Sequence, residues 1–196
     1  MSVANSALPS NGRPGLSWAR IARRIRVPLS FVVGVLYCWL AQPSWLALAI
    51  GLAVVALGLA LRAAASGHIR KDRELSMTGP YAYTRNPLYL GSLLIGIGFA
   101  IASRSLWVVL ALMVLLAAIY WPLIGAEEQY LRSRFPDFES YARRVPRLLP
   151  RFGVGAPASA GFSRDLYRQH REYQAVIGAL VVTAILVVKI VWLQGR

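Results

Sequence analysis

The chain has 196 residues, of which 57% are hydrophobic, and it combines a mean hydropathy of +0.50 with a formal net charge of +14. This combination excludes an ordinary soluble domain, because so apolar a chain can carry so many charges only if the two kinds of residue are segregated. Segregation of this kind is typical of a membrane protein, in which apolar spans alternate with charged loops.

Five apolar segments predict an all-α, polytopic membrane protein of about five transmembrane helices. A span needs roughly 18 apolar residues, and the first segment is slightly short of that length. The predicted spans are 27–41, 44–61, 88–103, 105–124 and 174–193. Short turns at "QPS" and "SRS" join the first span to the second and the third to the fourth, so each pair is expected to form an antiparallel hairpin. Small residues in the second span, Gly51 and Gly58 among them, predict close helix packing.

The polar segments divide the chain into four parts. Residues 1–26 form a basic and partly disordered amino-terminal tail, and residues 27–152 form a core of four spans with a cytoplasmic motif segment. Residues 153–173 combine a flexible linker, "GVGAPASAG", with a polar interfacial helix, and residues 174–196 add a carboxyl-terminal transmembrane helix. Lys189, near the outer end of this last span, is expected to snorkel to the interface.

Arginine and lysine predict the orientation of the chain, because basic residues near span ends stay on the cytoplasmic side. They gather before the first span, between the second and third, and between the fourth and fifth, whereas the opposite side has only Arg104 and Arg196. We therefore expect an integral protein of the cell (inner) membrane with its amino terminus inside and its carboxyl terminus outside. All acidic residues lie in segments 62–86 and 125–173, so the active site should face the cytoplasm. Arginine clusters can also bind nucleic acid, but the membrane accounts for them here, and no nucleic-acid partner is predicted.

Two motifs carry most of the chemistry. The stretch "GPYAYTRNPLYLG", residues 79–91, places Tyr81, Arg85, Asn86 and Tyr89 at the expected start of the third span, where a helix amino terminus favours an anion. Its simpler interpretation is a helix start with aromatic residues at the membrane interface. The second motif is the adjacent pair Glu127 and Glu128 at the inner end of the fourth span. A carboxylate pair facing an arginine would form a polar site roofed by aromatic rings.

These two motifs, followed by "YARRVPRLLP", resemble the isoprenylcysteine carboxyl methyltransferases and the phosphatidylethanolamine N-methyltransferases. The resemblance covers roughly residues 57–152. It implies an integral membrane enzyme that binds S-adenosylmethionine at the cytoplasmic face and takes a membrane lipid or amphiphilic acceptor from the bilayer. The Arg-His-Pro motif of the family falls on Arg85, Asn86 and Pro87, followed by Tyr89 and Gly91, and its glutamate pair falls on Glu127 and Glu128. Arg62 and His68 also lie where relatives carry polar residues.

The resemblance implies a role for each of these residues toward S-adenosylmethionine. Arg85 with Asn86 suits the carboxylate of the cofactor, Glu127 or Glu128 suits its ammonium or ribose, and Tyr81 or Tyr89 suits its sulfonium or adenine. Gly91 would let the cofactor approach the third span. The catalytic residues are then Arg85 and Glu128. The cofactor-binding residues are Tyr81, Arg85, Asn86, Pro87, Tyr89, Gly91, Glu127 and Glu128.

Two departures from the family pattern bear on the acceptor. Asn86 stands in place of the usual histidine, and it can still donate a hydrogen bond. Gly125 and Ala126 precede the glutamate pair where carboxyl-methylating relatives tend to carry arginine, so an amine or neutral head group is expected rather than a carboxylate. No metal site is predicted, because His68 and His170 stand alone and Cys38 is the one cysteine.

Two other functions stay open at this point. One is an NADPH-dependent membrane reductase of the sterol-reductase type, and the other is a non-catalytic membrane scaffold. A scaffold would have no need for Arg85 opposite a carboxylate pair. The sequence does not indicate the oligomeric state.

Overall fold

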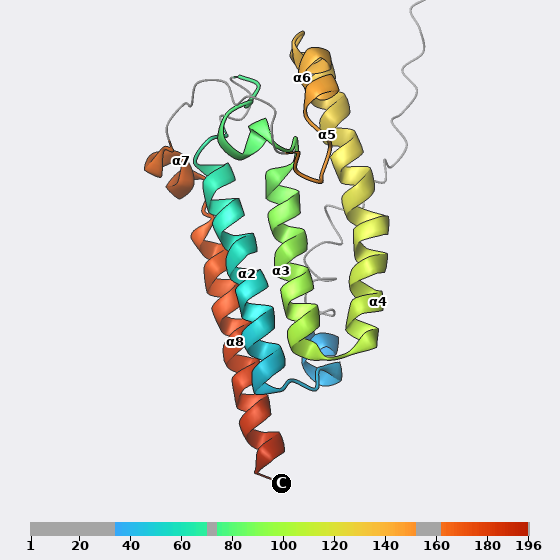
Figure 1. Ribbon diagram of the computed structural model, residues 1–196, viewed down its shortest axis with the longest axis vertical. Coiled ribbons are helices and arrows are strands. Elements are labelled where there is room, and N and C mark those ends of the chain that lie inside the picture. The colour runs from blue at the N-terminus through green and yellow to red at the C-terminus, as the bar shows by residue number, and fades with distance from the viewer. Residues whose placement is uncertain (1–33, 70–73, 152–161, 196) are drawn as a thin grey trace, which may run out of the picture.

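The computed structural model describes residues 34–69, 74–151 and 162–195 (Figure 1). The predicted tail, 1–26, and linker, "GVGAPASAG", lie outside these residues. Every regular element within the described ranges is helical, which confirms the all-α class. Residues 34–40 are helical and are followed in order by α2 (Trp45–Ser66), η1 (Gly79–Ala82), α3 (Pro87–Ser103), α4 (Leu106–Leu115), η2 (Leu116–Tyr120), α5 (Trp121–Arg134), α6 (Phe138–Arg144), α7 (Arg164–Gln169) and α8 (Tyr173–Gln194).

Three helices in the described part of the chain are long and apolar enough to cross a membrane. They are α2, the continuous helix Leu106–Arg134 formed by α4, η2 and α5, and α8. Helix α3 is apolar but shorter, with 17 residues. These four helices correspond to the last four predicted spans. The first predicted span lies partly outside the described residues, so the count of five stays a prediction.

Glycine residues bring α2 and α3 into close contact. A Cβ atom added to Gly51 would lie 2.4 Å from the carbonyl oxygen of Gly98, and one added to Gly58 would lie 2.7 Å from the carbonyl oxygen of Gly91. Real Cβ atoms do not come so near to backbone, so the two helices can approach this closely only because these positions lack side chains. The close packing predicted for the second span is confirmed.

Outside the motif region, local interactions determine where the helices begin and end. The Ser44 side chain caps α2 by accepting a hydrogen bond from the amide of Ala47. Arg104 ends α3 in the left-handed region, with φ 50°, and so turns the chain into α4. Lys189 was expected to snorkel to the interface. In the structure its Nζ donates hydrogen bonds to the carbonyl oxygens of Cys38 at 2.6 Å and Trp39 at 3.0 Å. It thereby satisfies carbonyl groups at the end of helix 34–40.

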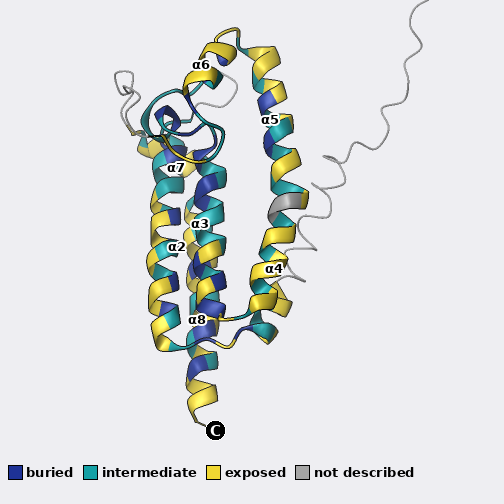
Figure 2. Cartoon of the chain, turned by 45° about the vertical axis from the view of Figure 1, so that its right-hand side comes forward, coloured by how far each residue is buried: buried dark blue, intermediate teal, exposed yellow. Residues whose placement is uncertain are grey.

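One end of the bundle collects the polar segments. The carboxyl-terminal ends of α2 and α5 and the amino-terminal ends of α3 and α8 lie at this end together with η1, α6 and α7 (Figure 1). Exposed residues run along the outer faces of α2, α4 and α8 (Figure 2), and many of them are large and apolar. Such faces are expected for helices surrounded by lipid. The helices therefore present apolar side chains outward and hold the charged segments at one end.

Candidate functional site

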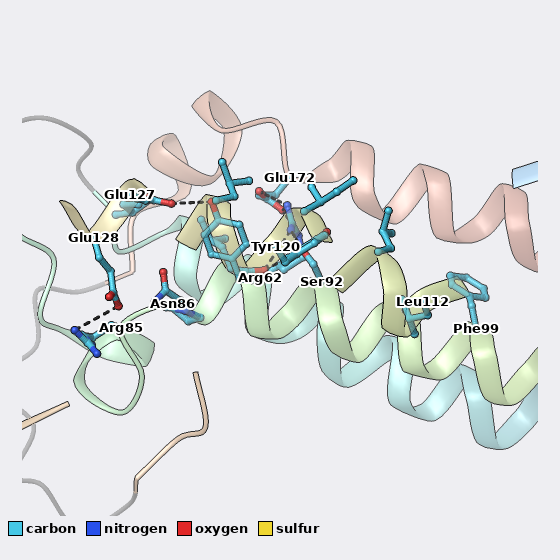
Figure 3. A pocket seen from close by; sticks show the side chains of 18 of the residues that line it. Arg62, Arg85, Asn86, Ser92, Phe99, Leu112, Tyr120, Glu127, Glu128 and Glu172 are labelled. Carbon is cyan, nitrogen blue, oxygen red and sulfur yellow. Dashed lines mark hydrogen bonds and ion pairs between the residues drawn. The ribbon is translucent and has the colours of Figure 1, made fainter. Parts of the chain in front are cut away.

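A cavity of about 1110 Å³ extends from the polar end of the bundle along α3 and α4. Figure 3 shows Arg85 and Glu128 at one end of it and Phe99 and Leu112 at the other. The polar part of its wall includes Arg62, Tyr81, Arg85, Asn86, Tyr89, Glu127, Glu128 and Glu172. The apolar part includes Val35, Phe99, Leu112, Leu115, Val182 and Ile185. A cavity with these two ends suits a ligand that has a charged head and a hydrocarbon tail.

The structure brings Arg85 and Glu128 together, with a second arginine. Arg85 Nη1 lies 3.3 Å from Glu128 Oε1, while Arg147 donates to Glu128 Oε2 from Nε at 3.0 Å and from Nη2 at 2.5 Å. Glu128 is only 5% exposed. Two guanidinium groups on one buried carboxylate leave a net positive charge at this end of the cavity. An anionic group of a ligand would be stabilised there.

Backbone and side-chain hydrogen bonds hold Arg147 in place. The segment around it lies across the motif loop, because Arg85 N donates to Pro146 O at 2.9 Å and Thr84 Oγ1 donates to Leu148 O at 2.9 Å. Asn86 Nδ2 donates to the carbonyl oxygen of Arg147 at 2.9 Å. Asn86 thus braces the segment that carries Arg147, a role different from the cofactor contact expected for it. Its second N–H remains available for a ligand.

Tyr141 adds a further link between the same two segments. Its hydroxyl donates to the carbonyl oxygen of Tyr81 at 2.8 Å. Burial raises the pKa of Tyr141 above its ordinary value, so the hydroxyl stays protonated and remains a donor. Its ring packs with Phe138 and Val145 in a small core cluster. The hydrogen bond from Tyr141 therefore ties the loop that carries Arg85 to this cluster.

Two buried polar atoms near the positive cluster are not fully satisfied. Arg85 Nε has no hydrogen-bond partner within the described part of the chain, and Glu128 Oε1 accepts no hydrogen bond there beyond its ion pair with Arg85. Buried polar atoms in native proteins are nearly always paired. Unused donor capacity on a buried guanidinium in a cavity wall is the arrangement expected of a ligand-binding arginine.

Tyr89 orients the other member of the glutamate pair. Its hydroxyl donates to Glu127 Oε2 at 2.8 Å, and its ring packs edge to face against Tyr120, with 5.7 Å between the centroids. Tyr120 ends the π-helical turn η2, and such turns change the direction in which the following side chains face. Glu127, Tyr89 and Tyr120 all line the cavity.

Gly91 is not among the described residues that line the cavity, and the cofactor contact predicted for it stays a prediction. A Cβ atom there would lie 2.5 Å from Arg62 Cγ and 2.8 Å from the carbonyl oxygen of Gly58. Gly91 therefore faces α2, and its small size serves helix packing. The other seven predicted residues, which all line the cavity, are Tyr81, Arg85, Asn86, Pro87, Tyr89, Glu127 and Glu128.

Sequence reasoning missed a second charged pair in the wall. Arg62 donates to Glu172 from Nε and from Nη2, both at 2.9 Å, and its Nη1 contacts Ser92 Oγ and the Leu88 carbonyl oxygen. Glu172 immediately precedes α8, and its side chain is 10% exposed. The available signal was a lone carboxylate at the start of an apolar span, since such a group needs a partner. Arg147 was also missed, although it lies in the "YARRVPRLLP" motif.

Among the described residues, no group of three or more histidine, cysteine, aspartate or glutamate side chains could hold a metal ion. The site consists instead of guanidinium groups, carboxylates and tyrosines around one cavity.

Comparison with known proteins adds family information. The phospholipid methyltransferase family matches residues 29–137. The chain is 39% identical over 85 residues to a cobalt-zinc-cadmium resistance protein of Cupriavidus metallidurans and 39% identical over 87 residues to a nickel-cobalt-cadmium resistance protein of Alcaligenes xylosoxydans xylosoxydans. Each of these matches covers 43% of this chain, and the shares of the relatives covered are 39% and 40%.

A third relative is the protein-S-isoprenylcysteine O-methyltransferase of Schizosaccharomyces pombe, 30% identical over 149 residues, which are 69% of this chain and 60% of that protein. The chain thus matches about two fifths of the length of the first two relatives and less than two thirds of the third. No solved structure matches the chain at a significant level. The family match covers more than half of the chain and includes Arg85, Glu127 and Glu128, but it ends before Arg147 and Glu172.

Proposed function

The chain belongs to the phospholipid methyltransferase family, and from this premise we propose that it is an integral membrane methyltransferase that uses S-adenosylmethionine to methylate a lipid-like acceptor. The observation that carries the proposal is the cluster of Arg85 and Arg147 around the buried carboxylate of Glu128, at the polar end of a cavity whose other end is apolar. The acceptor we propose has an amine or neutral head group.

The residues of the cavity fit the cofactor. Arg85 has an unused N–H at Nε, and the cluster around it carries a net positive charge, so a carboxylate is the ligand group expected there. The rings of Tyr81 and Tyr89 line the same wall, and tyrosine faces attract cationic groups such as a sulfonium. Ligand pockets typically measure about 300–1,000 Å³. A cavity of about 1110 Å³ therefore has room for the cofactor and for part of an acceptor.

S-adenosylmethionine, when bound, supplies an electrophilic methyl group on a positively charged sulfur. The chain contributes alignment and exclusion of water, which can lower the barrier without a nucleophilic residue. An ammonium acceptor must also lose a proton. We propose that Glu127 is the base that accepts this proton. Tyr89 holds Glu127 by one hydrogen bond, whereas Glu128 is already engaged by Arg85 and Arg147. Glu128 then acts by positioning Arg85, and transfer to an amine should increase with pH as the amine deprotonates.

The alternatives receive less support. Family membership does not favour a sterol-type reductase, and a scaffold gives no reason for unused donor capacity on a buried arginine. Space around Gly125 is open, and Arg147, the extra cation at the glutamate pair, is committed to Glu128. No free cation stands beside Glu127 among the described residues to receive an acceptor carboxylate, which supports the amine or neutral head group.

The test is ligand stabilisation of the purified full chain. We expect S-adenosylhomocysteine to raise the thermal unfolding midpoint and NADPH to leave it unchanged, since a ligand at 100 times its Kd stabilises by about 2.7 kcal/mol. Stabilisation by NADPH, or by neither compound, would overturn the proposal. Incubating membranes with methyl-labelled S-adenosylmethionine would then identify the acceptor by its label. A base-labile methyl ester would contradict the amine, whereas a stable methylamine would support it.

A further inference from the structure

The cavity has a second polar region beside the Arg85 cluster, where Figure 3 shows Glu127, Glu172 and Arg62. Tyr81 belongs to the same cavity wall. Tyr81 comes from η1, Glu127 from α5, and Glu172 from the turn before α8. Tyr81 is 6% exposed, and its hydroxyl has no hydrogen-bond partner within the described residues. An unpartnered buried hydroxyl in a cavity wall points to a missing ligand group.

The charges of this region are the reverse of those around Arg85. The carboxylates of Glu127 and Glu172, offset by the guanidinium of Arg62, leave one net negative charge. Burial raises the pKa of Tyr81 above its ordinary value, and the carboxylates of Glu127 and then Glu172 add to the increase, while Arg62 opposes it. Both carboxylates and the hydroxyl line the same cavity, and the hydroxyl stays protonated. A monocation is the ligand whose charge balances this region.

The backbone on the amino-terminal side of Glu172 is held in place. Arg171, which precedes it, lies in the left-handed region with φ 52°. Upstream, Ser163 N donates to Gly67 O at 3.0 Å, and Phe162 packs so closely on Gly67 that a Cβ there would lie 2.2 Å from its ring. Arg62 uses one lone-pair site on each oxygen of Glu172, and a carboxylate has about four such sites. Glu172 therefore keeps acceptor capacity for a further donor.

We propose that Tyr81, Glu127 and Glu172 form a subsite for the ammonium head group of the acceptor, and that Glu172 makes the site prefer an amine over a neutral head group. A primary ammonium offers three N–H donors, and the subsite offers a hydroxyl and two carboxylates to accept them. A neutral hydroxyl head group offers one donor and no charge. Glu172 lies beyond the family-matched residues, so the family match does not itself indicate this preference. The inference rests on the proposed function only in naming the ligand as the methyl acceptor.

Binding of a simple amphiphile tests the subsite without any methyl transfer. Dodecylammonium and dodecanol share a tail and differ in the head group, and their affinities for the purified full chain would be measured by titration calorimetry in a maltoside detergent. The wild type should bind dodecylammonium at least about tenfold more tightly, since hydrogen bonds to a charged group contribute more than neutral ones. Glu172→Gln and Tyr81→Phe should each remove most of this preference. Neither should change the affinity for dodecanol.

The controls separate this inference from the proposed function. Glu139→Gln removes the same charge from an exposed pair with Arg132, and it should leave the preference intact. Tyr81→Phe removes an unpartnered hydroxyl and should not lower the unfolding midpoint, so it decides the matter even if Glu172→Gln folds poorly. Unchanged dodecylammonium affinity in Tyr81→Phe would overturn the subsite. Weaker S-adenosylhomocysteine binding in that variant, with the ammonium preference intact, would assign the region to the cofactor instead. Failure of the wild type to bind S-adenosylhomocysteine would overturn the proposed function and leave the ammonium measurement standing.

Discussion

Glu128 shows how one buried carboxylate organises the positive end of the cavity. Arg85 contacts one of its oxygens and Arg147 the other, so the carboxylate keeps two guanidinium groups from repelling each other at short range. The two arginines are 62 residues apart in number, between 85 and 147, and only folding brings them to the same group. The unused Nε of Arg85 then faces a site that is already assembled.

Replacement of Arg85 should separate the two contributions of its guanidinium, charge and fork geometry. Arg85→Ala should weaken binding of S-adenosylhomocysteine by about 2–4 kcal/mol, the range for truncating one partner of a buried charge pair. Arg85→Lys should restore little, because an ammonium lacks the planar fork. Titration calorimetry with the purified chain measures both variants. Arg132→Ala, at an exposed pair, should bind as the wild type does, and wild-type affinity in Arg85→Ala would end the assignment of this residue.

Replacement of Glu128 should affect the fold as well as the site. Glu128→Gln leaves Arg85 and Arg147 without their shared anion, and we expect a loss of about 3 kcal/mol in the free energy of unfolding, at the low end for a buried pair because Arg147 is 36% exposed. Hydrogen exchange should speed up in the segment around Arg147, and methyl transfer should fall sharply. Glu139→Gln, whose side chain is 53% exposed, should cost less than about 1 kcal/mol. Equal losses in the two variants would contradict the organising role of Glu128.

At the residue scale, the sequence predicted those cavity residues that stand close together in short motifs. Tyr81, Arg85, Asn86 and Glu127 stand in compact motifs, and all of them reach the cavity. Glu172 could not be found in this way, because its partner Arg62 precedes it by 110 residues. The face of a helix on which a residue lies was equally hard to predict from the sequence. Gly91 shares a motif with cavity residues, yet on the helix surface it faces α2.

At the scale of elements, apolar length predicted the spans well and their ends less well. Helix α5 continues to Arg134, past the predicted end at 124, because polar residues can extend a helix beyond the membrane. It stops where Phe135 precedes Pro136, since a residue before proline avoids the helical region. The π-helical turn at Leu116–Tyr120 carries no mark in an apolar run and was not predicted. Composition indicates where lipid begins, whereas local backbone restrictions decide where a helix ends.

The α2–α3 contact allows a matched pair of identical substitutions. Gly51→Ala would place a Cβ atom 2.4 Å from the Gly98 carbonyl oxygen, so we expect a loss of about 1–3 kcal/mol despite the better helix propensity of alanine. Gly178→Ala in α8 meets nothing within 4 Å and should stabilise by up to about 1 kcal/mol. The thermal unfolding midpoints in detergent measure both effects. A midpoint for Gly51→Ala at or above that of the wild type would show that the two helices are not held this closely.

For the whole molecule, the distribution of charge and the arrangement of helices lead to the same conclusion. Basic segments that are far apart in sequence meet at the end of the bundle where the cavity has its charged residues. Each basic side chain near an anionic lipid surface contributes about 1 kcal/mol of attraction. The polar end of the cavity is therefore expected at the cytoplasmic surface, and the apolar end within reach of lipid tails.

This orientation can be tested on the full chain by cysteine labelling. In a Cys38→Ser background, Gly195→Cys places one thiol just beyond α8, and Ser140→Cys places one on the exposed face of α6 at the opposite end. Because basic residues stay inside, a membrane-impermeant maleimide should label Gly195→Cys in intact cells and Ser140→Cys only after the membrane is opened. The two variants control each other, since both thiols are exposed and differ only in the end of the bundle they occupy. The reverse pattern would place the Arg85 cluster outside the cell, and a cytoplasmic cofactor could then not reach it.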